Sequence, residues 1–302
     1  MADFIVPLYM NGLQGRMLRL PPPANKKREI LLVYGHHASI ERMFSIAEVM
    51  NRYGGVTLPD LPGFGGMESF YKIGEKPTLD NLADYLAAFM KLRYKGRRVS
   101  IMATSFGFIV TTRMLQRYPE LAKKIDLLIS FVGFTHKEDF KFKGWEYWGL
   151  RGWCALWSNR LPAAFMKHLL LRGPVIRGVY RLVADRHAKL KDGDAEERNA
   201  RIEFEIFLWQ ANDIRTHMDT FITMLKVDLC NKQVDLPLYH VAVDADRYFD
   251  NHVVEQHMGV IYNDVTVLKS PLSAHAPTVI ADAATASKFI PVKLKRLLAR
   301  QK

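Results

Sequence analysis

The chain has 302 residues, of which 49% are hydrophobic and 25% are charged, an ordinary composition for a globular protein with a large core. Its two cysteines, Cys154 and Cys230, exclude a disulfide scaffold and favour a reducing compartment, which we expect to be the cytoplasm. The net charge of +12 permits anionic partners, but the sequence has no zinc-finger spacing or RNA-binding signature, so we expect no nucleic-acid partner. The first residues do not form a signal-peptide pattern, and no apolar run is long enough to span a bilayer.

The first predicted element is a β-hairpin over residues 3–20. Two strand-like segments flank residues that favour turns, Asn11-Gly12 and Gly15. Three consecutive prolines follow and end the hairpin.

Apolar and amphipathic segments then alternate along the chain. The apolar segments predict buried strands at residues 29–34, 56–58, 99–102, 125–132, 236–243 and 265–268. The amphipathic segments predict helices at residues 40–51, 80–90, 108–118 and 253–261, and a basic amphipathic helix at 288–302. Because this alternation is typical of a mostly parallel sheet flanked by helices, the predicted fold class is α/β.

Residues 136–228 interrupt the alternation, since they contain helical patterns and no strand of comparable strength. We therefore predict a core made of residues 1–135 and 229–302, with residues 136–228 inserted as a helical cap. All five tryptophans lie in this segment, and the simplest use of each is to hold the cap together. Basic residues recur between residues 161 and 183. They allow weak association with an anionic membrane surface, although a solvated face is the more common use of such charges.

The candidate catalytic residue lies in Ala103-Thr-Ser105-Phe-Gly107, between a predicted strand and a predicted helix. A strand that turns at once into a helix makes a tight corner, which exposes its middle residue and requires small residues two positions to either side. Ala103 and Gly107 meet that requirement. Ser105 then stands at the N-terminus of a helix, where backbone N–H groups favour developing negative charge.

This pentapeptide resembles the nucleophile elbow of the α/β-hydrolase family, with Ala103 in place of the first glycine. Three further segments resemble family motifs and occur in the family's order, each after a predicted strand. They are the glycine-containing loop at residues 35–39, the Asp60-Leu-Pro-Gly-Phe-Gly-Gly66 loop, and Ser273-Ala-His275-Ala-Pro277, which resembles the loop of the catalytic histidine. The resemblance covers residues 30–133 and 236–281. It implies an α/β-hydrolase fold with an N-terminal antiparallel hairpin and a cap.

The resemblance also implies a triad in the order Ser105, Asp246 and His275. Val243-Asp-Ala-Asp246-Arg-Tyr-Phe249 resembles the family's acid motif, with Val243 in place of a glycine, and aligns Asp246 with the acid. Asp244 and Asp250 compete for this role, and Asp139 is the nearest candidate at a second acid position known in the family.

The oxyanion hole of this family is formed by backbone N–H groups. By resemblance, these would be the N–H of Phe106 and that of His36 or His37. We expect no bound metal at the His36-His37 pair, because no aspartate or cysteine cluster accompanies it.

The expected function is a serine hydrolase, of carboxylesterase or lipase type, that cleaves an ester, thioester or related acyl bond of a largely apolar small molecule. We expect no cofactor, and the sequence does not determine the oligomeric state. The alternatives are a C–C bond or amide hydrolase with the same triad, a non-catalytic ligand-binding protein, and a basic interaction protein. Halide and epoxide hydrolases carry aspartate at the elbow, so Ser105 argues against that class.

Overall fold

The computed structural model describes residues 1–183, 195–244, 246–271 and 282–300. Its centre is an eight-stranded sheet with the order β1-β2-β4-β3-β5-β6-β7-β8. The strands are β1 (Ile5–Met10), β2 (Leu13–Leu20), β3 (Glu29–Val33), β4 (Gly55–Pro59), β5 (Val99–Thr104), β6 (Ile125–Phe131), β7 (Leu238–Val243) and β8 (Val265–Ser270). The pairs β1–β2 and β2–β4 are antiparallel, and the other neighbours are parallel. This confirms the predicted α/β class.

The N-terminal hairpin is also confirmed, with one correction. Asn11 and Gly12 both have positive φ, as a two-residue hairpin turn requires. Gly15, which the sequence suggested as a turn residue, instead lies within β2 opposite Leu8. A Cβ on Gly15 would lie 2.5 Å from the sulfur of Met67, so the glycine allows close packing rather than a turn.

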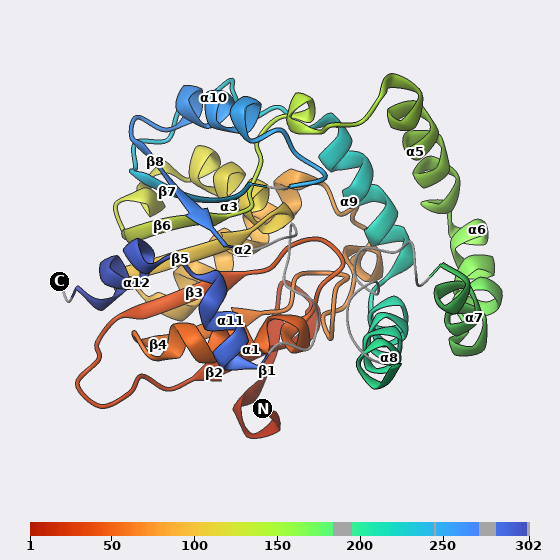
Figure 1. Ribbon diagram of the computed structural model, residues 1–302, viewed down its shortest axis with the longest axis horizontal. Coiled ribbons are helices and arrows are strands. Elements are labelled where there is room, and N and C mark those ends of the chain that lie inside the picture. Colours follow the sequence, from red (N-terminus) through yellow and green to blue (C-terminus); the bar gives the residue numbers. More distant parts are fainter. Residues whose placement is uncertain (184–194, 245, 272–281, 301–302) are drawn as a thin grey trace.

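Helices cover both faces of the sheet (Figure 1). They are α1 (Ile40–Asn51), α2 (Leu79–Tyr94), α3 (Phe106–Arg117), α4 (Pro119–Ala122), α10 (Asn251–Ile261), α11 (Ala283–Phe289) and α12 (Val292–Ala299). Helix α1 packs beside α11, and α2 packs beside α3. The single C-terminal helix expected from the sequence is two helices, because Pro291 lies between them and cannot continue the first.

The strands β3, β5, β6 and β7 are buried along nearly their whole length, because helices cover both of their faces. Their side chains belong to one large apolar cluster that also includes the inner faces of α1, α2 and α3. This core fixes the carboxyl ends of the parallel strands at one edge of the sheet. Ligands of open α/β sheets bind at that edge.

In the described part of the segment between β6 and β7, five α-helices gather beside the sheet (Figure 1). They are α5 (Gly144–Trp157), α6 (Arg160–Phe165), α7 (Gly173–Val183), α8 (Ala195–Ala211) and α9 (Ile214–Lys226), and α6 continues into a π-helical turn, η4 (Met166–Leu170). They enclose two small apolar clusters that are separate from the main core. The two ends of this segment meet, since His136 pairs with Asp228 in an isolated β-bridge.

Candidate active site

Ser105 occupies the corner between β5 and α3. Its φ of 47° and ψ of −116° fall outside the common regions for residues with a side chain, and such backbone strain typically costs about 1–3 kcal/mol. Two features hold the corner in place. The N–H of Ser105 donates to the carbonyl of Phe131 on the neighbouring strand at 3.0 Å, and Phe106 begins the helix at once. Strain of this kind, maintained by its surroundings, is typical of functional residues.

Small residues surround Ser105, as the sequence predicts. A Cβ on Gly107 would lie 2.4 Å from the carbonyl oxygen of Tyr34 and 2.7 Å from that of Val33, so only glycine allows α3 to approach β3 this closely. A Cβ on Gly35 would lie 3.3 Å from the Cβ of Ser105. The loop after β3 therefore lies directly against the candidate nucleophile.

That loop carries the candidate oxyanion-hole residues His36 and His37. His37 has a positive φ of 53°, which bends the loop sharply after Gly35. Within the residues that the structure describes, neither the backbone N–H of His36 nor that of Phe106 donates a hydrogen bond to a backbone carbonyl. The N–H of Phe106 belongs to the residue that follows Ser105, and the N–H of His36 belongs to the residue that follows Gly35, so both are candidate donors to an oxyanion.

The His36 ring faces cap helix α9. Its Nε2 lies 3.0 Å from the carbonyl oxygen of His217 and 3.0 Å from the hydroxyl of Thr220. Burial, with a contribution from nearby His37, lowers the pKa of His36 from 6.5 to about 3. The ring is therefore neutral at pH 7, and its N–H can donate to the His217 carbonyl.

His217 is the corresponding cap residue, and its ring centroid lies 4.2 Å from that of His36. Burial, followed by the charges of His36 and His37, lowers the pKa of His217 well below its ordinary value. Its Nδ1 is buried and has no hydrogen-bond partner among the residues that the structure describes. Phe64, Phe106 and Phe221 complete the aromatic surroundings of His36.

His37 faces a second cap helix, α8. Its Nε2 lies 3.3 Å from the buried carboxylate of Glu205, and its ring centroid lies 4.4 Å from that of Trp209. Arg42 on α1 donates to the carbonyl of His37 at 3.0 Å and lies 3.9 Å from Glu205. The two histidines thus connect the loop beside Ser105 to both α8 and α9.

Asp246 lies three residues beyond β7, in a buried position. Its Oδ1 accepts the N–H groups of Tyr248 at 2.8 Å and Phe249 at 3.2 Å, which fix the carboxylate. Lys141, just inside the cap, donates to the carbonyl of Asp246 at 2.8 Å. Because β5 and β7 both flank β6 in parallel, the topology brings Asp246 to the same sheet edge as Ser105.

The competing acids have other roles in the structure. Asp250 caps α10 by accepting the N–H groups of His252 and Val253, a role typical of an aspartate directly before a helix. Asp244 is largely exposed and forms an ion pair with Lys269 at 3.0 Å.

The second acid position is also engaged elsewhere. Asp139 is fully buried, and its Oδ2 accepts the N–H groups of Thr135 and His136 at 2.8 and 3.0 Å. Its Oδ1 lies 2.5 Å from Nδ1 of His257, a histidine of α10. This carboxylate therefore joins the start of the cap to the core.

The third predicted residue, His275, lies outside the described residues. The preceding strand, β8, is parallel to β7 and ends at Ser270. The last described residue of this strand therefore lies at the same edge of the sheet as Ser105 and Asp246.

Asp60 begins the loop that resembles a family motif, and it serves as a buried anchor. Its two carboxylate oxygens accept from Arg16 Nε at 2.8 Å, the Tyr34 hydroxyl at 3.0 Å, and the N–H groups of Ile40 and Gly66. Burial raises the pKa of Asp60, while the charge of Arg16 opposes the shift. The network fixes the loop that bears Phe64 beside His36.

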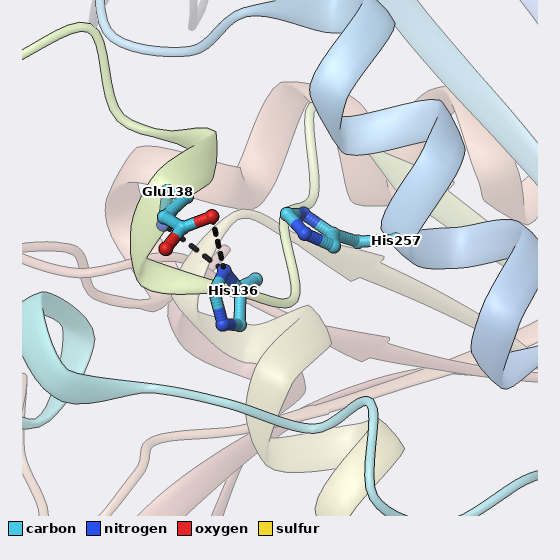
Figure 2. A group of neighbouring side chains, drawn as sticks. All are labelled: His136, Glu138 and His257. Atoms are coloured by element: carbon cyan, nitrogen blue, oxygen red, sulfur yellow. Dashed lines mark hydrogen bonds and ion pairs between the residues drawn. The ribbon is translucent and has the colours of Figure 1, made fainter.

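One group of side chains in the described chain could hold a metal ion. Figure 2 shows His136, Glu138 and His257, which each offer a ligand atom within 4.8 Å of the others. Zinc binds its ligands at about 2.0–2.2 Å, so these atoms would have to move closer to share an ion. As placed, His136 Nδ1 accepts the N–H of Glu138 at 3.2 Å and His257 Nδ1 faces Asp139. The arrangement is therefore a hydrogen-bonded contact at the base of the cap.

The sequence did not identify several residues of this region, notably His217, Glu205 and Arg16. Each lies far along the chain from the residues it contacts, and no local pattern marks it. The only available signal was a polar side chain within the apolar pattern of a helix, as at His217 and Glu205.

Comparisons with solved structures cover nearly the whole chain. No protein-family model and no curated protein sequence matches it. A deformylase from Pseudomonas putida S16 aligns over 93% of this chain and 98% of its own, with 16% identity and a TM-score of 0.64. The enol-lactonase of Burkholderia xenovorans LB400 aligns over 91% and 93%, with 11% identity and a TM-score of 0.63. A potato (Solanum tuberosum) epoxide hydrolase aligns over 90% and 92%, with 13% identity and a TM-score of 0.64. Together with the sheet order and the strained Ser105 corner, these similarities show that the chain has the α/β-hydrolase fold.

Proposed function

We propose that the chain is a serine hydrolase that cleaves an ester, thioester or related acyl bond through an acyl-enzyme. The observation that carries the proposal is Ser105, a strained residue with positive φ at the corner between β5 and α3. The similar structures are named for attack on different bonds, so the fold leaves the bond open. An ester is the first choice, because a serine nucleophile attacks acyl carbons, whereas an epoxide hydrolase of this fold would carry aspartate at position 105.

In the proposed reaction, His275 takes the proton of the Ser105 hydroxyl as the oxygen attacks the acyl carbon, and then returns it to the leaving group. Asp246 orients the histidine and stabilises its charged form. The fixed position of the Asp246 carboxylate supports this role. The N–H groups of Phe106 and His36 stabilise the oxyanion, and each such donor typically lowers the barrier by about 3–4 kcal/mol.

The side chains around His36, in the loop beside Ser105, favour an apolar acyl group. His36 is neutral, and it lies among Phe64, Phe106 and Phe221. Ligand sites with apolar and aromatic side chains bind mainly by burying apolar surface and use few polar contacts. We infer that the buried Nδ1 of His217 is one such polar contact for a substrate heteroatom. His217→Phe should then raise KM more than it lowers kcat.

A fluorophosphonate probe tests the nucleophile. The wild type should be labelled at Ser105, and Ser105→Ala should not be labelled. The matched control Ser287→Ala, a change on α11, should be labelled at the wild-type rate. Labelling that persists in Ser105→Ala contradicts the assignment, and a wild type that neither reacts nor hydrolyses any ester indicates a non-catalytic protein.

A panel of p-nitrophenyl esters with increasing acyl length tests the acid. Asp246→Asn should lower kcat by roughly ten-thousandfold, because the histidine loses its orientation and its countercharge. Asp139→Asn should lower stability but leave kcat within about threefold at temperatures where the variant is folded. If Asp139→Asn abolishes activity and Asp246→Asn does not, the second acid position is the correct one.

A further inference from the structure

The cap carries an unusual concentration of exposed apolar side chains. Of the 19 large apolar residues that are exposed in the described part of the chain, 11 lie between Trp145 and Leu182. Monomeric proteins rarely expose large contiguous apolar patches, and those that do usually bind a partner or a membrane there.

Helix α5 presents one entire apolar face to solvent. Trp145, Trp148, Trp153 and Leu156 are all exposed, and their spacing of three, five and three residues places them on one side of the helix. Trp145 is 73% exposed, although tryptophan is usually well buried. The opposite side of the helix, with Cys154 and Trp157, packs into the cap. The expectation that each tryptophan holds the cap together is therefore wrong for the three on the outer face.

The next helical elements continue this surface. On α6 and η4, Leu161, Phe165 and Leu169 follow one another at four-residue spacing and are exposed, with Leu161 at 81%. The buried Ala163 and Met166 of the same elements face the cap interior.

Helix α7 has two apolar faces. Ile176 packs against α8, whereas Val175, Val179 and Leu182 are exposed, with Leu182 at 87%. Figure 1 shows α5, α6 and α7 following one another along the edge of the molecule away from the sheet. We call the exposed apolar residues of α5, α6, η4 and α7 the cap outer face.

The same elements are strongly basic. Residues 143–183 contain seven lysines and arginines and one acidic residue, Glu146. Arg160, Lys167, Arg172 and Arg181 are exposed, which places positive charge beside the apolar residues. The guanidinium of Arg151 lies 5.0 Å from the ring centroid of Trp148.

We propose that the cap outer face docks on the surface of an anionic phospholipid bilayer. Surface-binding helices combine apolar residues with lysine and arginine, and tryptophan favours the level of the lipid headgroups. None of the helices in the described part of the chain has the length and apolar composition that a membrane span requires. A second copy of the chain is the less suitable partner, since a basic face would then meet an equally basic face. The proposal does not depend on the proposed catalytic function.

Vesicle sedimentation of the full-length protein tests the proposal. Binding to phosphatidylcholine vesicles that contain phosphatidylserine should be at least tenfold tighter than to pure phosphatidylcholine vesicles, and should weaken with salt. The triple variant Arg160→Ala, Arg172→Ala, Arg181→Ala should lose roughly a hundredfold in partition, because each basic residue near an anionic surface contributes about fivefold. Brominated lipids should quench tryptophan fluorescence in the wild type.

Matched variants separate this face from the rest of the surface. Leu161→Asp with Leu182→Asp should abolish vesicle binding. Leu92→Asp with Val292→Asp, at comparably exposed positions outside the cap, should leave it unchanged. Equal binding to neutral and anionic vesicles overturns the proposal. The proposal also fails if the wild type does not bind vesicles, forms a dimer in sedimentation equilibrium, and becomes monomeric in the variant Leu161→Asp with Leu182→Asp.

Discussion

Gly107→Ala tests whether the close approach of α3 to β3 shapes the site. The new Cβ would lie 2.4 Å from the carbonyl oxygen of Tyr34 and 2.7 Å from that of Val33. A separation under 3.0 Å is essentially never seen, so the helix must move by at least 0.6 Å (3.0 − 2.4). Both obstacles are backbone atoms of a central strand or the residue after it, and no rotamer change removes the overlap.

The expected loss of stability is about 3 kcal/mol, the upper end of the usual cost of overpacking, because the surroundings cannot yield. For a chain of this length the melting temperature should fall by roughly 5 °C. The displacement also moves Ser105 and the N–H of Phe106, and misplacement by about an ångström can lower activity up to a hundredfold. We therefore expect slower labelling by fluorophosphonate as well.

Urea unfolding and labelling rates measure both effects. Gly259→Ala on α10 is the matched control, since its Cβ would have no atom within 4 Å. It should increase stability by up to about 1 kcal/mol and leave labelling unchanged. If Gly107→Ala unfolds at the wild-type urea concentration and is labelled at the wild-type rate, the argument that this contact positions Ser105 is wrong.

Three further predictions concern stability. Ser105→Gly should stabilise the protein by about 1 kcal/mol in urea unfolding, because glycine relieves strain of about 1–3 kcal/mol and loses about 0.5–1 kcal/mol in entropy; equal or lower stability would show that the corner is not strained. His36 remains neutral in the folded state down to about pH 3, whereas the unfolded histidine gains a proton below about pH 6.5, so its contribution is complete above pH 6.5 and is lost as pH falls toward 3. Because of this residue, the free energy of unfolding should fall by up to about 2 kcal/mol between pH 7 and pH 5. His36→Gln should remove that part of the pH dependence. If the pH dependence of stability is the same in wild type and variant, the lowered pKa of His36 is wrong. Asp60→Asn should lower the free energy of unfolding by about 3 kcal/mol, because Arg16 loses a buried partner. Asp84→Asn removes a more exposed ion pair and should cost less than about 1 kcal/mol. Similar losses in the two variants would contradict the role of burial.

The local elements of the fold were readable from the sequence. Apolar periodicity predicts the positions of β3, α1, β5 and α3. The small residue Gly107 adds that β5 turns directly into α3 in a tight corner. The hairpin follows from Asn11-Gly12, and the capping role of Asp250 follows from its place before a helix. These features depend on residues that are close along the chain, so composition and spacing contain the information.

The tertiary structure decided which distant residues meet. His36 and His217, Asp60 and Arg16, and Asp139 and His257 are separated by 44 to 181 residues, and nothing local to any of them predicts its partner. The same holds for the outer tryptophans of α5. A helix with apolar residues on more than one side can bury only the face that a neighbour covers, and which face is covered depends on how α5 packs against α9. The sequence by itself therefore determined the elements and the candidate nucleophile, whereas packing determined the walls of the site and the exposed face of the cap.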